Sequence, residues 1–158
     1  MKTLNDLYNY AAKKNIKIKK YHFNGDKHWK GHCIYNNSNN CMIFLNDNIK
    51  DNVQEKCTLA HEIGHFKKGI LQNNILSSEY RDRLLRSIND YRANKWAIDK
   101  LIPFEDFKRY LDSNYSKYEV ANELEVTEDL LDIAYFIYEP YLKNINWKEK
   151  MYVSIWIC

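Results

Sequence analysis

Apolar residues recur at helical spacing over most of the chain, and this pattern predicts six helices. The first begins at Thr3, which can cap a helix together with Asp6 three residues later. The second begins at a similar cap, Asp51, and Pro103 ends the third. The helices are expected at about residues 3–12, 51–68, 78–102, 104–111, 117–124 and 127–138.

Shorter stretches have the alternating or β-prone composition of strands. Residues 16–23 are predicted to be extended, because Ile16 and Ile18 alternate with lysines. Residues 33–35 and 41–45 are two further candidate strands, and the asparagine-rich segment 36–40 between them favours a hairpin. The last stretch, 151–157, is also β-prone. Because the strands come before most of the helices, the order indicates an α+β fold with a small antiparallel sheet on a mainly helical body.

Length and composition narrow the class of protein. A chain of 158 residues fits one domain, 1–158, with a helix and small sheet in 1–50, two long helices in 51–103 and C-terminal helices and tail in 104–158. The formal net charge of +3 is too weak to indicate a nucleic-acid partner. The sequence contains no secretory signal pattern and no membrane-length apolar run. We therefore expect a cytoplasmic protein whose four cysteines are reduced.

The second predicted helix carries the segment His61-Glu62-Ile63-Gly64-His65. Residues four apart lie on one face of a helix, so His61 and His65 can both bind one Zn²⁺. Glu62 is offset by about 100° and can reach a water molecule without binding the metal. The segment therefore predicts a zinc hydrolase in which Glu62 is the general base. Gly64 is small where this helix would pack closely against another.

A catalytic zinc ion needs a third protein ligand, which should come from outside this helix. The downstream candidates are Glu79, Asp82 and Asp90, all on the third predicted helix. Asp90 is favoured because Asn94, four residues later on the same face, could support His61. Ala93 beside them would let the two helices approach. A solvent-exposed aspartate without a metal remains the alternative interpretation of Asp90.

Two motifs in order resemble the ImmA/IrrE family of metallo-endopeptidases. The first is Thr58-Leu59-Ala60 followed by the His61–His65 segment, and the second runs from Asp90 to Ala97, a few residues before Leu101-Ile102-Pro103. The family's second motif reads E-x-x-A-N-x-[FW]-A, so this chain has aspartate where the family has glutamate. The resemblance extends to the leading hairpin and to residues 120–131.

The resemblance implies a zincin-like fold and hydrolysis of peptide bonds. It also implies that His61, His65 and Asp90 bind Zn²⁺ and that Glu62 is the catalytic base. Members encoded by prophages and mobile elements cleave helix-turn-helix repressors, which makes such a repressor the expected partner. The shorter Asp90 can serve as the ligand if the two helices sit close together.

Residues 118–131 also have the pattern of a DNA-binding helix-turn-helix. The second helix of this pair begins with Glu128, Asp129 and Asp132, which would repel phosphates, so no direct nucleic-acid contact is expected. The pair is instead interpreted as core or as a surface that meets the substrate protein. Its acidic helix is a candidate docking face for a basic DNA-binding domain.

Several weaker interpretations remain open at this level. His22, His28 and His32 could form an accessory metal site, Tyr80 or Tyr91 could stabilise the oxyanion, and strand 41–45 could pair with the substrate backbone. An alternative function is a non-catalytic metal-containing protein that binds a repressor or an antitoxin-like partner. The intact Glu62 argues against this alternative, since a structural site has no use for a general base.

Overall fold

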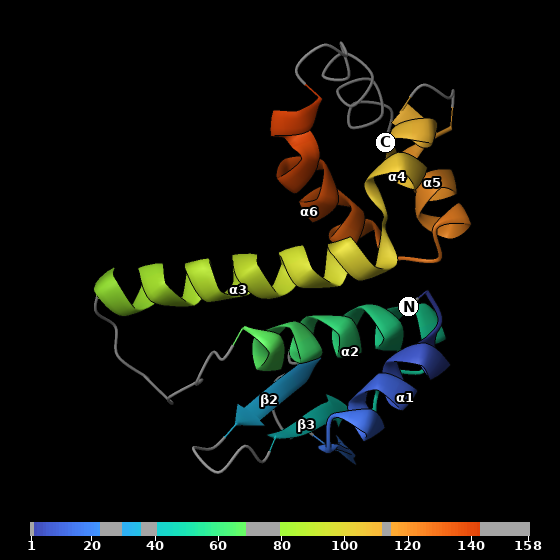
Figure 1. Ribbon diagram of the computed structural model, residues 1–158. Helices are drawn as coiled ribbons and strands as arrows, with labels where there is room; N and C mark the ends of the chain where they lie inside the picture. Colours follow the sequence, from blue (N-terminus) through green and yellow to red (C-terminus); the bar gives the residue numbers. More distant parts are fainter. Residues whose placement is uncertain (1, 23–29, 36–40, 69–79, 112–114, 143–158) are drawn as a thin grey trace.

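A computed structural model describes residues 2–22, 30–35, 41–68, 80–111 and 115–142. Over these residues the fold is a small three-stranded sheet packed against a body of six α-helices, which confirms the α+β class (Figure 1). The strands are β1 (Ile16–Tyr21), β2 (Gly31–Tyr35) and β3 (Cys41–Asn46). The β-prone stretch 151–157 lies outside the described residues.

Four of the helices begin at side-chain caps, Thr3, Asp51, Ser116 and Thr127. Thr3 and Asp6 form a capping box at the first helix, and Asp51 accepts hydrogen bonds from the backbone N–H groups of Val53 and Gln54 at the second. The six helices are α1 (Leu4–Lys13), α2 (Asn52–Lys67), α3 (Tyr80–Leu101), α4 (Phe104–Leu111), α5 (Lys117–Glu123) and α6 (Glu128–Tyr138), followed by a 3₁₀ turn at Glu139–Tyr141. All six lie within a few residues of their predicted bounds.

The sheet has the order β1-β3-β2, with β3 in the centre. β2 and β3 are antiparallel, as the hairpin prediction required, with Cys33 opposite Ile43. β1 pairs with β3 in parallel, with Ile18 also opposite Ile43. The sheet is therefore mixed, and the prediction of a wholly antiparallel sheet was wrong. β1 and β3 are not consecutive strands: the chain runs through β2 between them, and β2 runs opposite to β3 on the other side of it, so β1 and β3 point the same way.

Helix α2 lies in the middle of the molecule. The sheet and α1 lie on one side of it, and α3 runs along the other side, with α6 beyond α3 (Figure 1). Leu59, Ala60 and Ile63 of α2 are completely buried in the core. Because α2 is covered on both sides, most of its residues are buried, polar ones included. This position gives its polar side chains a low-dielectric environment.

Helices α5 and α6 form the pair that resembles a helix-turn-helix. They are joined by a turn in which Glu125 has a φ of 52°, in the left-handed region. Glu128 and Asp132 lie next to Lys117, and Asp129 pairs with Lys30. These lysines offset much of the acidic charge that the sequence suggested as a docking face. Across the described residues, no helix is both long and apolar enough to cross a membrane.

Candidate active site

The site is built where α2 and α3 come closest together. A Cβ atom added to Gly64 would lie 2.5 Å from the backbone oxygen of Ala93, so only glycine fits between the helices here. Ala93 itself is fully buried. Both small residues were predicted to allow a close approach, and the structure confirms it. The approach brings side chains of the two helices within reach of each other.

His61, His65 and Asp90 come together at this contact. Their ligand atoms all lie within 4.8 Å of one another, and they form the only potential metal-binding group among the described residues. The two Nε2 atoms are 2.9 Å apart, and Asp90 Oδ1 lies 3.4 Å from His65 Nε2. A tetrahedral zinc ion with bonds of about 2.0–2.2 Å separates its ligand atoms by roughly 3.3–3.5 Å. The group therefore fits a zinc-sized ion.

Asn94 orients the first histidine. Its carbonyl oxygen lies 2.6 Å from Nδ1 of His61 and can only accept a hydrogen bond, so this nitrogen donates. In a neutral ring the lone pair is then on Nε2, which points to His65. Burial, together with the nearby His65, lowers the pKa of His61 and keeps it neutral. A neutral ring with an oriented lone pair is the form that binds a metal.

Glu62 is buried beside this group, with only 5% of its surface exposed. One carboxylate oxygen, Oε2, has no hydrogen-bond partner among the described residues. Burial raises the pKa of Glu62 to about 7, while the charge of His65 and the backbone N–H of Cys33 act in the opposite direction. A buried carboxylate without a full set of partners lowers the stability of the folded protein, and such groups are concentrated at functional sites.

Strand β2 approaches Glu62 through Gly31. A Cβ atom there would lie 2.9 Å from the Thr58 side chain and 3.1 Å from Glu62. Sequence reasoning missed this glycine, although its place just before a predicted strand could have marked it. β2 is an edge strand, whereas β3 is paired on both sides. The expectation that the strand at 41–45 pairs with substrate was therefore wrong, because its backbone groups are already used.

A cleft of about 380 Å³ opens in front of His61 and Glu62. Its lining comes from α2, from the start of β2, from Asn94 and from the first turns of α6. The contribution of α6 was not foreseen beyond a surface that meets the substrate. Lys30 and Asp129 pair at 3.2 Å between β2 and α6, and both side chains are well exposed.

The remaining sequence candidates lie elsewhere. His22 bonds Asp47 at 3.0 Å, and His32 lines the cleft, so these two do not form a metal group. Tyr91 lies exposed on α3. His28 and Glu79 lie outside the described residues, as do the side chains of Tyr80 and Asp82.

A helix with two histidines and a glutamate in this spacing, beside a second acidic group, is the arrangement found in metallopeptidases. The family model of peptidase family M78, described as the IrrE N-terminal-like domain, matches residues 11–135. The match covers most of the chain, which therefore belongs to this family of metallopeptidases. It extends from α1 into α6 and includes the whole site. The comparison with curated proteins gave no match.

Proposed function

We propose that this chain is a zinc-dependent endopeptidase in which His61, His65 and Asp90 hold the metal and Glu62 is the general base. The observation that carries the proposal is the state of Glu62. Its carboxylate is buried, one oxygen has no partner among the described residues, and it stands on α2 directly next to His61. A purely structural metal site would not need such a group.

Each residue has a defined task in this proposal. Zn²⁺, when bound, polarises the scissile carbonyl and makes a water molecule more acidic. Glu62 accepts the proton of the attacking water and later gives it to the leaving amine. A pKa raised to about 7 by burial lets this side chain both take up and release a proton near neutral pH. Asn94 holds His61 in the orientation that binds metal.

The proposed substrate is a regulatory protein, and specifically a helix-turn-helix repressor. The resemblance to ImmA/IrrE proteins supports the repressor. The small cleft supports a restricted substrate, since about 380 Å³ accommodates few substrate side chains. Further contacts away from the scissile bond would then contribute to recognition.

Metal content tests the site directly. Purified wild-type protein should contain about one Zn²⁺ per chain, and His61→Ala and His65→Ala should lose most of it. His22→Ala is the matched control, because His22 bonds Asp47 outside the group. Equal zinc content in all four proteins would contradict the assignment.

Activity is tested on a panel of purified helix-turn-helix repressors, starting with any that is encoded beside this gene. Cleavage at one or few sites, stopped by a chelator and restored by Zn²⁺, is the expected result. Cleavage that persists in the chelator would exclude the metal mechanism. Equally fast digestion of unrelated unfolded proteins would exclude the restricted substrate.

A further inference from the structure

Helix α6 forms one wall of the catalytic cleft. Its first turns line the cleft together with the part of α2 that carries His61 and Glu62, and the start of β2 contributes further residues. The second helix of the pair that has the helix-turn-helix pattern thus lines the reaction site. What α6 offers at this wall determines which substrate side chains fit there.

The wall is apolar where it enters the cleft. Leu130 and Ile133 are three residues apart on α6, so they lie on one face of the helix, and both line the cleft. Leu130 is buried in the core, whereas Ile133 is only partly buried. Ile133 therefore keeps aliphatic surface that a ligand could cover. Covering such surface is favourable by about 25 cal/mol per Å².

The charges beside this wall cancel each other. Asp129 belongs to the first turn of α6 and also lines the cleft, but its carboxylate pairs with Lys30. A charged substrate side chain would have to displace one partner of this pair. The cleft therefore offers a charged side chain little attraction at this position and leaves the aliphatic surface as the main feature.

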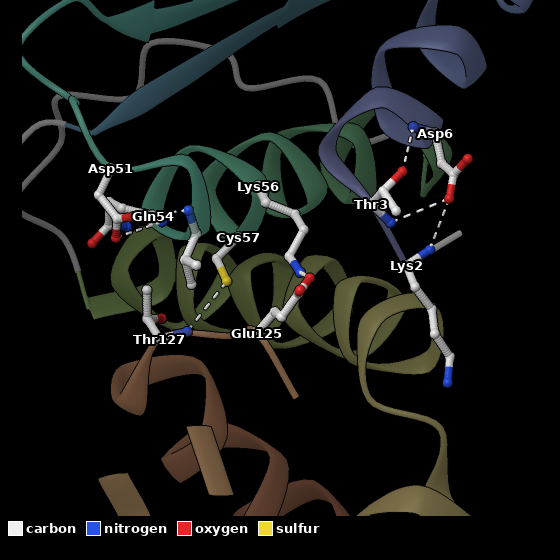
Figure 2. A network of polar contacts seen from close by, with 10 residues as sticks. Lys2, Thr3, Asp6, Asp51, Gln54, Lys56, Cys57, Glu125 and Thr127 are labelled. Carbon is white, nitrogen blue, oxygen red and sulfur yellow. Dashed lines mark hydrogen bonds and ion pairs between the residues drawn. The ribbon is translucent and has the colours of Figure 1, made fainter. Parts of the chain in front are cut away.

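Contacts with α2 hold the wall in place (Figure 2). The Lys56 ammonium group, on a buried side chain, pairs with Glu125 at 3.3 Å, and the Thr127 backbone N–H donates to Cys57 Sγ at 3.4 Å. Both contacts join the start of α6 to the helical turn that precedes His61. The distance between the wall and the catalytic group is thus set by the same helix that carries the chemistry.

We infer that Leu130 and Ile133 form a specificity subsite for an aliphatic side chain, such as leucine, on a substrate residue that flanks the scissile bond. The inference rests on the proposed peptidase function. The side chain would be covered by the α6 wall while the adjoining backbone lies in front of Glu62.

The subsite is tested by changing Ile133, which is not part of the catalytic group. A mixture of peptides of diverse sequence is digested, and the cleavage sites are identified by mass spectrometry. The wild type should favour leucine, isoleucine, valine or methionine at one flanking position.

Ile133→Ala should lower kcat/KM for the best such peptide by about 10-fold, and Ile133→Asp should move the preference towards lysine and arginine. Phe136→Ala, on the same helix but exposed outside the cleft lining, should leave the preference unchanged.

A second measurement does not depend on hydrolysis. Equilibrium binding of a labelled leucine-containing peptide and its serine counterpart is compared in Glu62→Gln protein, with and without Ile133→Asp. Tighter binding of the leucine peptide by about 5-fold, lost in the Ile133→Asp protein, is expected. Discrimination in binding without any hydrolysis by the wild type would support the subsite and overturn the peptidase. Hydrolysis by the wild type with no aliphatic preference, or one that Ile133→Asp leaves intact, would overturn the subsite alone.

Discussion

Helix α2 carries two buried glutamates whose environments differ. Glu55 lies in its first turn and Glu62 two turns later, and they are exposed by only 9% and 5%. Glu55 accepts a hydrogen bond from the Tyr8 hydroxyl and pairs with Lys20, so both of its oxygens have a partner. Glu62 has one oxygen without a partner among the described residues. The two glutamates are thus alike in burial, and what separates Glu55 from the proposed base Glu62 is the set of partners.

The two environments have opposite physical consequences. A buried carboxylate costs free energy unless opposite charge and hydrogen bonds compensate it. At Glu55 that compensation comes from α1 and β1, and the group joins these elements to α2. Burial and the Glu55 contact raise the pKa of Tyr8, which keeps its hydroxyl protonated as a donor. At Glu62 the compensation is incomplete, so the carboxylate can exchange a proton near neutral pH.

The largest expected effect comes from Glu62→Gln. The amide keeps the shape of the side chain but cannot accept a proton, so kcat should fall by about 10²- to 10⁴-fold. Zinc content should remain that of the wild type, and the melting temperature should stay equal or rise, because a poorly compensated acid is removed. Retention of near wild-type kcat on the same substrate would exclude Glu62 as the base.

The same substitution at the other glutamate should have the reverse outcome. Glu55→Gln removes the charge that Lys20 pairs with and weakens the hydrogen bond from Tyr8. The free energy of unfolding should fall by about 1–3 kcal/mol, with zinc content and kcat per folded molecule unchanged. Denaturant unfolding and activity at a temperature where both proteins are folded provide the comparison. A loss of kcat as large as that of Glu62→Gln would remove the distinction between the two sites.

Local features of the sequence predicted much of this fold and site. Helix periodicity and the caps at Thr3 and Asp51 predicted where the helices lie, because both signals depend only on residues close together in the sequence. The pairing of His61 with His65 follows from one turn of helix, and Gly64 and Ala93 indicated the close helix contact. Asp90 could be singled out as a candidate ligand because it stands at a fixed spacing before Ala93 and Asn94 on one helix.

The features that sequence reasoning missed depend on contacts between distant segments. Alternation in β1 is the same whether its partner is parallel or antiparallel, so the mixed sheet and the place of β2 at its edge could not be predicted. The α5–α6 pair has the pattern of a DNA-binding motif. Beside the cleft it is joined to α2 at Lys56 and Cys57, about seventy residues earlier in the chain. No local pattern encodes such a contact.

The smallest effect is expected when the lysine of the ion pair beside Glu55 is replaced, and this pair sharpens the comparison because its two partners differ in burial. The Lys56 side chain is 4% exposed and that of Glu125 is 69% exposed. In Lys56→Met the remaining glutamate is hydrated and the apolar chain stays packed, so stability should change by less than about 1 kcal/mol. In Glu125→Ala the buried ammonium group loses its partner, and the cost should reach about 1–3 kcal/mol.

The Cys57–Thr127 contact and the buried Val126 should keep α6 docked in both variants, with unchanged zinc content. Unfolding of the two variants in parallel measures the asymmetry. Equal losses would mean that the free energy of the pair lies in mutual attraction and not in the burial of the lysine.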